Sequence, residues 1–252
     1  MDTGALDFSL ETTQVVEVQV VESAIAPDLS TAIQAGWEWM FEGGSHSLVA
    51  LCVGGAEGTR RADGGFNKAY QGHTDPGNQV WNLGTFSYQH GASSVEEADQ
   101  KQLARLHRQV AQQQQQAADL GLELTLEQTL NGADLANQSP TSGLGHSTSR
   151  GYIPLLVDAT LSGQEGDSAI HWARVASYLF PRSHPRAGQW NAPGLGNTRG
   201  NVERDQQRRM DRCNDAIAAW KANSLPAPGL ENLPVVEQEV EQTYGALSFE
   251  FP

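Results

Sequence analysis

Apolar residues recur at helical spacing over much of the chain. The pattern predicts helices over residues 93–119, 125–137, 151–162 and 201–222, because the apolar positions of each stretch fall on one side of a helix with about 3.6 residues per turn. Ser93 or Ser94 caps the first of these stretches and Gly121 follows it, and these residue types favour a helix start and a helix end. The central part of the chain is therefore predicted to be mainly helical.

Two further stretches are apolar on nearly every side and are predicted to be central helices. The first is capped by Ser45 or Ser47 and runs to about Glu57. The second lies within a helix predicted over 167–180, where residues 170–180 are apolar in most positions. A helix of this kind has no polar face for water, so we expect both to be surrounded by other elements.

The helical period disappears between residues 58 and 91, where glycines are frequent. Phe66–Tyr70 and Thr85–Gln89 are the strand candidates, and the sequence Asp75-Pro-Gly-Asn78 between them favours a sharp turn. We expect a small β-hairpin lobe inserted between helices. The predicted fold class is thus mainly α (α+β).

The net charge of −14 comes mostly from the two ends of the chain. Residues 1–35 contain six acids and residues 222–252 contain five, and neither segment contains Lys or Arg. We therefore predict an acidic, partly flexible N-terminal leader over 1–35, with one candidate strand over 12–21, a folded domain over 36–221, and an acidic tail over 222–252. Residues 31–42 are apolar enough for a short helix or a docking segment.

Composition argues against several classes of protein. The folded domain is nearly balanced in charge, whereas a nucleic-acid-binding domain needs a dense basic patch. The basic cluster over 199–212 is interleaved with acids and is interpreted as a solvated helix face.

No apolar run approaches the roughly 20 residues of a membrane span. The first residues lack the pattern of a secretory signal, which leaves the localisation open.

The two cysteines, Cys52 and Cys213, are too few for a disulfide scaffold. Both occupy core-facing positions of predicted helices. We expect two buried thiols, although a bridge would be possible in an oxidising compartment.

Glu57 is the main candidate for chemistry. It ends a predicted apolar helix and is followed by Gly58, a natural residue for a helix C-terminus. A carboxylate there faces the negative end of the helix dipole, which costs about 0.3–1 kcal/mol. Apolar surroundings and this dipole favour the protonated carboxyl, as a general acid requires. The alternative is a solvent-facing glutamate at a fraying helix end.

Asp75 is the candidate for a second carboxyl. It lies in the predicted turn, 18 positions after Glu57. A helix-borne acid facing a second carboxyl across a cleft is the arrangement of many glycosidases. Aspartate also favours turns for purely structural reasons, through bonds to its own backbone, so both interpretations of Asp75 stay open.

These residues resemble the lysozyme-like superfamily. Ala56-Glu57-Gly58-Thr59 is similar to the Glu-Gly-Thr at the helix end of lambda-phage-type lysozymes. Asp75 with its turn, followed by Gly84-Thr-Phe-Ser-Tyr-Gln89, resembles the hairpin segment of goose-type lysozymes and lytic transglycosylases. The resemblance covers residues 45–92 by motif, and it implies a helix delivering Glu57, a small β lobe and surrounding helices. Chitosanases share this fold and are a nearby alternative.

Aromatic and polar side chains in the β region would suit a saccharide cleft, since sugar rings stack on aromatic faces. Core packing is the competing explanation for each aromatic residue. Trp81 and Phe86 are further aromatic residues of this region. The candidate substrate-binding residues are Thr59, Tyr70, His73, Asn82, Ser87, Tyr88, Gln89 and Trp190.

Other chemistries fit the sequence less well. His73, Asp75 and His90 together raise the alternative of a zinc site, but their spacing matches no metal signature. No Gly-x-Ser-x-Gly segment marks a serine nucleophile. No cofactor or resident metal is expected.

The sequence therefore leads to two hypotheses. The first is an enzyme, a muramidase-like glycoside hydrolase that cleaves β-1,4 linkages of an amino-sugar polymer, with peptidoglycan or, in the chitosanase-like alternative, chitosan as the polysaccharide partner. The second is a non-catalytic saccharide-binding or structural protein with the same fold.

Overall fold

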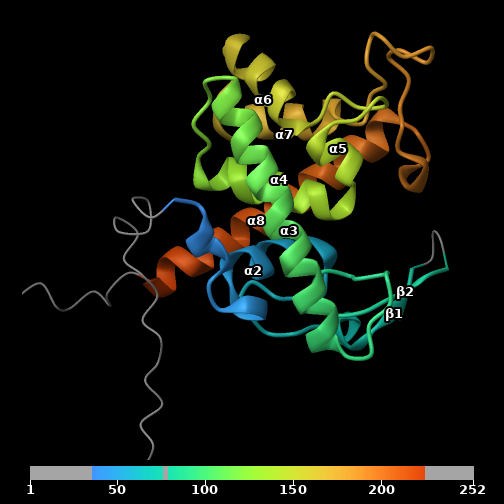
Figure 1. Cartoon of the computed structure of the whole chain (residues 1–252). Coiled ribbons are helices and arrows are strands. Elements are labelled where there is room, and N and C mark those ends of the chain that lie inside the picture. The colour runs from blue at the N-terminus through green and yellow to red at the C-terminus, as the bar shows by residue number, and fades with distance from the viewer. Residues whose placement is uncertain (1–35, 76–78, 225–252) are drawn as a thin grey trace, which may run out of the picture.

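The computed structural model describes residues 36–75 and 79–224. These residues form a mainly helical fold with one small antiparallel sheet, as the sequence predicted (Figure 1). The predicted leader with its candidate strand, and most of the acidic tail, lie outside the described residues. The α-helices of the described part are α2 (Leu48–Glu57), α3 (Val95–Asp119), α4 (Leu126–Gln138), α5 (Pro140–Leu144), α6 (Tyr152–Leu161), α7 (Gly166–Ala176) and α8 (Arg199–Ser224).

Short 3-10 helices and two short strands complete the described elements. The strands β1 (His73–Thr74) and β2 (Trp81–Asn82) pair in antiparallel register, His73 with Asn82 and Thr74 with Trp81. The 3-10 helices are η1 (Glu38–Phe41), η2 (Gly44–His46), η3 (Lys68–Gln71) and η4 (Pro193–Leu195).

Helix α2 forms as the sequence predicts. The Ser47 side chain accepts a hydrogen bond from the Ala50 N–H at its start, and Gly58 ends it in the left-handed conformation at φ 76°. Seven of its ten residues are buried. Their apolar side chains pack against α8 in a core cluster that also includes Leu106 and Leu130. The helix that ends at Glu57 is therefore central.

Cys52 of α2 and Cys213 of α8 form a disulfide, with Cα atoms 4.3 Å apart. The prediction of two buried thiols was wrong, although their burial is confirmed. Spacing along the chain could not show this pairing, because 161 residues separate the two cysteines and only the packing of α2 on α8 brings them together.

A second core cluster joins α4, α6 and α7. Thr125 and Gln128 form a capping box at the start of α4, each side chain bonded to the other's backbone N–H. Apolar residues of all three helices, among them Leu135, Leu156 and Ile170, fill the cluster. Figure 1 shows α3 running from the strands at one end of the molecule towards α6 at the other.

The predicted strands were wrong, although the hairpin exists. Phe66–Tyr70 forms a single bridge to Arg60 and then part of η3, and Thr85–Gln89 folds into turns with one bridge from Leu83 to Tyr88. Thr85 donates from its N–H and its hydroxyl to the buried carboxylate of Asp99, at 2.6 and 2.7 Å. Because these bonds occupy the Thr85 N–H, it cannot donate to a neighbouring strand. The two strands that do pair, β1 and β2, lie on either side of the Asp75 turn.

Helix α7 ends at Ala176, four residues before the predicted end, and it is not apolar all round. Trp172 is exposed on its outer face. Residues after Ser177 turn back so that Phe180 N–H donates to Gln189 O and Asn191 N–H donates to Tyr178 O. Pro181 favours this ending, since the residue before a proline avoids helical backbone. No helix in the described ranges is both long and apolar enough to cross a membrane.

Candidate active site

Glu57 occupies the last position of α2, where the buried helix meets the β region. Its side chain is 16% exposed, so it reaches solvent from a largely buried base. It extends towards α4 and α8, and both of these helices supply hydrogen-bond donors to it. The purely solvent-facing alternative for this residue does not describe the structure.

Two donors hold one oxygen of the Glu57 carboxylate. Arg209 Nη2 lies 2.6 Å from Oε1, and Asn137 Nδ2 lies 3.0 Å from the same atom. Asn137 also donates to Phe86 O at 3.2 Å, which ties α4 to the β region. None of the described residues donates to Oε2 of Glu57. One carboxylate oxygen is thus fixed in place by two donors.

Arg209 is itself held from behind by Asp134. Its Nε and Nη2 donate to the two oxygens of the Asp134 carboxylate, at 3.0 and 2.6 Å. Arg174 Nη2 donates to the same carboxylate at 2.6 Å. Asp134 and Arg174 are fully buried and Arg209 nearly so. Paired and bonded on all sides, these charges can persist away from water.

The electrostatics of this cluster favour its charged forms. Burial alone would raise the pKa of Asp134, but Arg209 and Arg174 outweigh it and hold that pKa below its ordinary value. Burial would likewise lower the pKa of the Arg209 guanidinium, yet Asp134 and Glu57 raise it well above its usual range. Asp134 and Arg209 therefore stay charged in the folded protein.

Neutral polar groups surround the cluster and fix its geometry. Arg174 donates to Asn131 from Nη1 and to Gln206 Oε1 from Nε at 3.0 Å. Gln206 and the Tyr178 hydroxyl both donate to Gln138 Oε1, at 2.9 and 3.0 Å. The arrangement links α4, α7 and α8 behind Glu57, so small shifts of any one helix would move the Arg209 guanidinium.

The β side of the site carries strain and unsatisfied polar atoms. Ser87 has φ 52°, a left-handed conformation that is uncommon for serine, and it follows Phe86, the acceptor of the Asn137 bond. The hydroxyl of Ser87 and the Oδ1 atom of Asn82 are buried, and no described residue forms a hydrogen bond with either. Strained residues and unpaired buried polar atoms are more frequent at functional sites than elsewhere.

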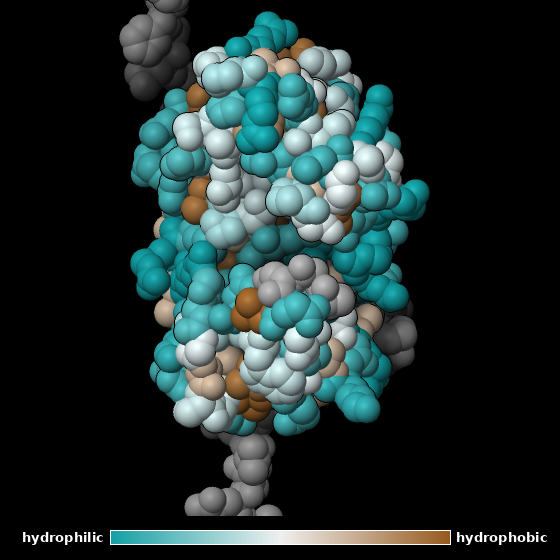
Figure 2. Space-filling model, turned by 90° about the vertical axis from the view of Figure 1, so that its right-hand side faces the viewer, coloured by the Kyte–Doolittle hydropathy of each residue, from teal (hydrophilic) through white to brown (hydrophobic). Residues whose placement is uncertain are grey.

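A groove crosses the face of the molecule that carries the β region. Figure 2 shows this face hollowed between an upper and a lower lobe, with mainly hydrophilic residues along the hollow. In Figure 1 the strands belong to the lower lobe on this side and α5 to the upper one. Glu57 contacts α4 and α8 from the end of α2, beside the chain that enters the β region.

The structure gives the other predicted site residues different surroundings. Thr59 is buried and its hydroxyl donates to Thr85 O and Gly54 O, so it holds the β region against α2. Tyr70 is mostly buried with its ring 4.0 Å from that of Phe66. Ser87 and Asn82 have the unpartnered atoms described above. Gln89 is exposed.

His73, Tyr88 and Asp75 are half-buried in the β region. The Nδ1 atom of His73 lies 3.2 Å from Ala69 O, and the ring of Tyr88 lies edge-on to that of His90 at 5.3 Å. Asp75 directly follows β1, and its backbone bonds to Val80 and Gln79 close the hairpin. Its structural role in the turn is therefore present, and a role in chemistry stays a prediction.

Trp190 lies apart from this group. It lines a separate cavity with residues of α7 and α8, and its backbone forms a bridge with Leu179. The alternative of a metal on His73, Asp75 and His90 finds no support, because the described residues contain no group of three or more His, Cys, Asp or Glu placed to share an ion.

Sequence reasoning missed Arg209, Asp134, Arg174 and Asn137. The basic cluster over 199–212 was interpreted as a solvated face, and this is wrong for Arg209, which is 4% exposed. The sequence feature that could have revealed this buried cluster lies in α4 and α7. Asp134 and Arg174 are charged residues with apolar neighbours on either side in the sequence, and a charge that is buried with such neighbours needs a partner.

No family model, curated protein or solved structure gave a significant match to the chain. The lysozyme-like superfamily therefore stays a prediction that depends on the motifs of residues 45–92.

Proposed function

We propose that the chain is a glycoside hydrolase that cleaves β-1,4 linkages of an amino-sugar polymer, with peptidoglycan as the favoured substrate. The observation that carries the proposal is the setting of Glu57. One carboxylate oxygen is held by Arg209 and Asn137, and the other has no donor among the described residues. A carboxyl held in one orientation with one free oxygen suits proton transfer to a bound substrate.

Glu57 acts as the general acid. Its Oε2 atom delivers a proton to the glycosidic oxygen of the leaving sugar as the bond to the anomeric carbon breaks. Arg209 bonds Oε1 of Glu57 throughout, so it also stabilises the carboxylate that remains after the transfer, and its bonds to Asp134 keep the guanidinium in place. Arg209 and Asn137 are positioning residues, because their contacts are with Glu57.

Asp75 is the second carboxyl of the proposed reaction. It activates a water molecule or stabilises the positive charge that develops on the sugar ring. Asp75 directly follows β1, one of the two strands in the lower lobe of Figure 1. If water attacks directly, the product anomer is inverted, and if a covalent or ion-paired intermediate forms, the anomer is retained. Proton NMR of the first products distinguishes these routes.

The substrate class is supported by the resemblance of residues 45–92 to lysozymes and by the polar groove of Figure 2. Tyr88, Asn82 and Ser87 of the β region are candidates for contacts with the sugar. Chitosan is the alternative substrate, as for the chitosanases. Assays on purified peptidoglycan and on chitosan oligomers of defined acetylation separate the two.

The test is release of reducing ends and loss of cell-wall turbidity by the full chain and by Glu57→Gln. The amide still accepts the Arg209 bond but cannot supply the proton, so we expect a loss of at least about a hundredfold. Glu127→Gln is the matched control, because Glu127 is also a helix-borne glutamate paired with a base, Lys221, but lies outside the site. It should keep wild-type activity.

Equal activity of the wild type and Glu57→Gln would refute the proposal. Binding of oligosaccharide by both proteins without turnover by either would instead select the non-catalytic saccharide-binding hypothesis.

A further inference from the structure

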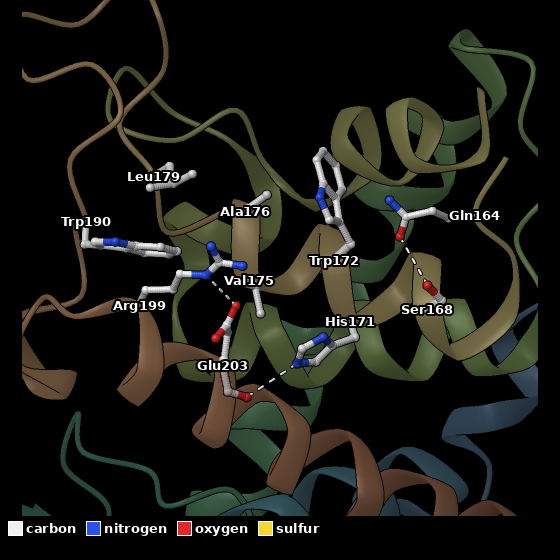
Figure 3. Close-up of a pocket in the computed structure, with 10 residues that line it drawn as sticks. All are labelled: Gln164, Ser168, His171, Trp172, Val175, Ala176, Leu179, Trp190, Arg199 and Glu203. Carbon is white, nitrogen blue, oxygen red and sulfur yellow. Dashed lines mark hydrogen bonds and ion pairs between the residues drawn. The ribbon is translucent and has the colours of Figure 1, made fainter. Parts of the chain in front are cut away.

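A second cavity lies between α7 and the first turns of α8, and it contains none of the proposed catalytic residues. Its volume is about 470 Å³, within the roughly 300–1,000 Å³ of small-molecule pockets. Figure 3 shows two indoles, those of Trp172 and Trp190, with Val175 and Ala176 between them. The floor is apolar, and the two aromatic side chains flank it.

The rim of this cavity is polar. Arg199 Nε lies 2.7 Å from Glu203 Oε1, and His171 Nε2 lies 3.4 Å from Glu203 O (Figure 3). Gln164 and Ser168 form a second hydrogen-bonded pair at 3.2 Å. One guanidinium faces one carboxylate, so the rim has no excess charge to attract an ion. It offers donors and acceptors to a neutral ligand.

The cavity is separated from Glu57 by the packing of α7 on α8. Glu203 and Arg209 are six residues apart on α8, about 9 Å along the axis and on sides that differ by about 120°. Arg174, between the cavity residues of α7, points inwards and bonds to Gln206 and Asp134. The packing of α7 on α8 around Arg174 therefore lies between the cavity and Glu57.

Trp172 is 39% exposed on the outer face of α7, so its ring is accessible to a ligand in the cavity that it lines. An apolar floor, two indoles and a neutral hydrogen-bonding rim together match a pyranose ring. Such a ring has apolar C–H faces and hydroxyls around its edge.

We propose that this cavity is an accessory saccharide site that binds one uncharged pyranose unit of a polysaccharide, apart from the site of cleavage. The sugar stacks on Trp172 or Trp190, and Glu203, Arg199 and Gln164 bond its hydroxyls. We take N-acetylglucosamine as that pyranose unit. This choice rests on the proposed function, whereas the assignment of a saccharide site does not.

The experiment uses the full chain, labelled with ¹⁵N and carrying Glu57→Gln to prevent turnover. Tetra-N-acetylchitotetraose is added, and the indole N–H signals of Trp172 and Trp190 are followed by NMR. We expect both signals to shift along one saturating curve. Trp172→Ala should weaken the binding reported by Trp190 by roughly tenfold, and a thermal unfolding curve that stays cooperative shows that the variant is folded.

Trp81→Ala is the matched control, since Trp81 is an exposed tryptophan of β2 outside this cavity, at 56% exposure. It should leave the Trp190 titration within twofold of the parent. The accessory site is supported if the Trp172 and Trp190 signals shift to saturation and if Trp172→Ala weakens the Trp190 titration. This holds even if the Glu57 assay shows no turnover. Shifts confined to Trp81, or no indole shifts at all, overturn it whatever the Glu57 assay shows.

Discussion

Arg209 Nη2 lies 2.6 Å from Glu57 Oε1, although the two residues are 152 positions apart in the chain. The same nitrogen lies 2.6 Å from Asp134 Oδ1. The guanidinium therefore connects a fully buried carboxylate with a partly exposed one. It supplies positive charge at the C-terminal end of α2, where the helix dipole alone would disfavour a glutamate. The acid that seemed misplaced in the sequence has a partner from α8.

Removing Arg209 should destabilise the fold strongly. Arg209→Ala leaves Asp134 buried with one of its two guanidinium partners, and breaking a buried pair in this way costs about 3–5 kcal/mol. Urea unfolding of the full chain measures the loss. Arg204→Ala is the control on the same helix, because Arg204 is exposed and its one side-chain partner among the described residues is Asn201. It should change stability by less than about 0.5 kcal/mol. Similar losses in both variants would contradict the buried cluster.

The Asp134 carboxylate should make stability depend on acid pH. Its pKa is lowered in the folded state, below the ordinary 3.8. The folded protein therefore holds Asp134 charged more firmly than the unfolded chain does. This contribution is fully present above the unfolded pKa and is lost as pH falls through the lower folded pKa.

Asp134→Asn tests that dependence. Urea unfolding from pH 7 down to pH 2 should show a flatter acid limb for the variant and a lower stability at pH 7. Asp215→Asn, which changes a side chain that is 54% exposed, should follow the wild-type curve. An unchanged acid limb in Asp134→Asn would show that this carboxylate contributes no such dependence.

The helices were predictable where local signals agree. Ser47, Ser94 and Thr125 cap α2, α3 and α4 as their residue types suggest, and apolar periodicity located α6 and α8. The end of α7 could not be predicted in this way, because the apolar residues Tyr178 and Phe180 stay buried in a loop after the helix has ended. The pattern of apolar residues indicates which positions are buried. Whether those positions are helical depends on backbone hydrogen bonds, such as the one from Phe180 N–H to Gln189 O.

The candidate site was predictable only at Glu57, which a local signal marked. Its partners come from α4 and α8 and depend on tertiary packing. Arg209 sits among exposed arginines with the same local pattern, so nothing in its own neighbourhood distinguished it. The strands failed for a similar reason, because Asp99 of α3 takes the backbone N–H of Thr85 that a strand would have used.

Reduction of the disulfide should loosen the packing of α2 on α8. Cys52 and Cys213 close a long loop, and loss of such a bond typically costs about 2–5 kcal/mol. Denaturant unfolding with and without a strong thiol reductant measures the effect. A variant with Cys52→Ala and Cys213→Ala should be less stable than the oxidised protein and should not respond to reductant. A wild type that is equally indifferent to reductant would mean that the two cysteines are not bonded in solution.

The glycines of α2 provide the sharpest test of how the β region packs beside Glu57. A Cβ atom on Gly54 would overlap the Cγ atom of Arg60 and lie 2.8 Å from Cγ2 of Thr85, whereas a Cβ on Gly55 would meet nothing closer than Arg212 O at 3.4 Å. Both positions have helical backbone, so alanine brings the same gain in helix propensity of about 1 kcal/mol at each.

Any difference between the two alanine variants therefore reports the contact alone. Gly55→Ala should be neutral or stabilising by up to about 1 kcal/mol, and Gly54→Ala should destabilise by about 1–3 kcal/mol, as overpacking does. Because Thr59 and Thr85 tie this part of the β region to α2, the displaced chain should also lower turnover if the proposed reaction occurs at Glu57. Thermal unfolding and the reducing-end assay measure the two effects, and equal stability of the two variants would mean that the β region does not pack against Gly54 as described.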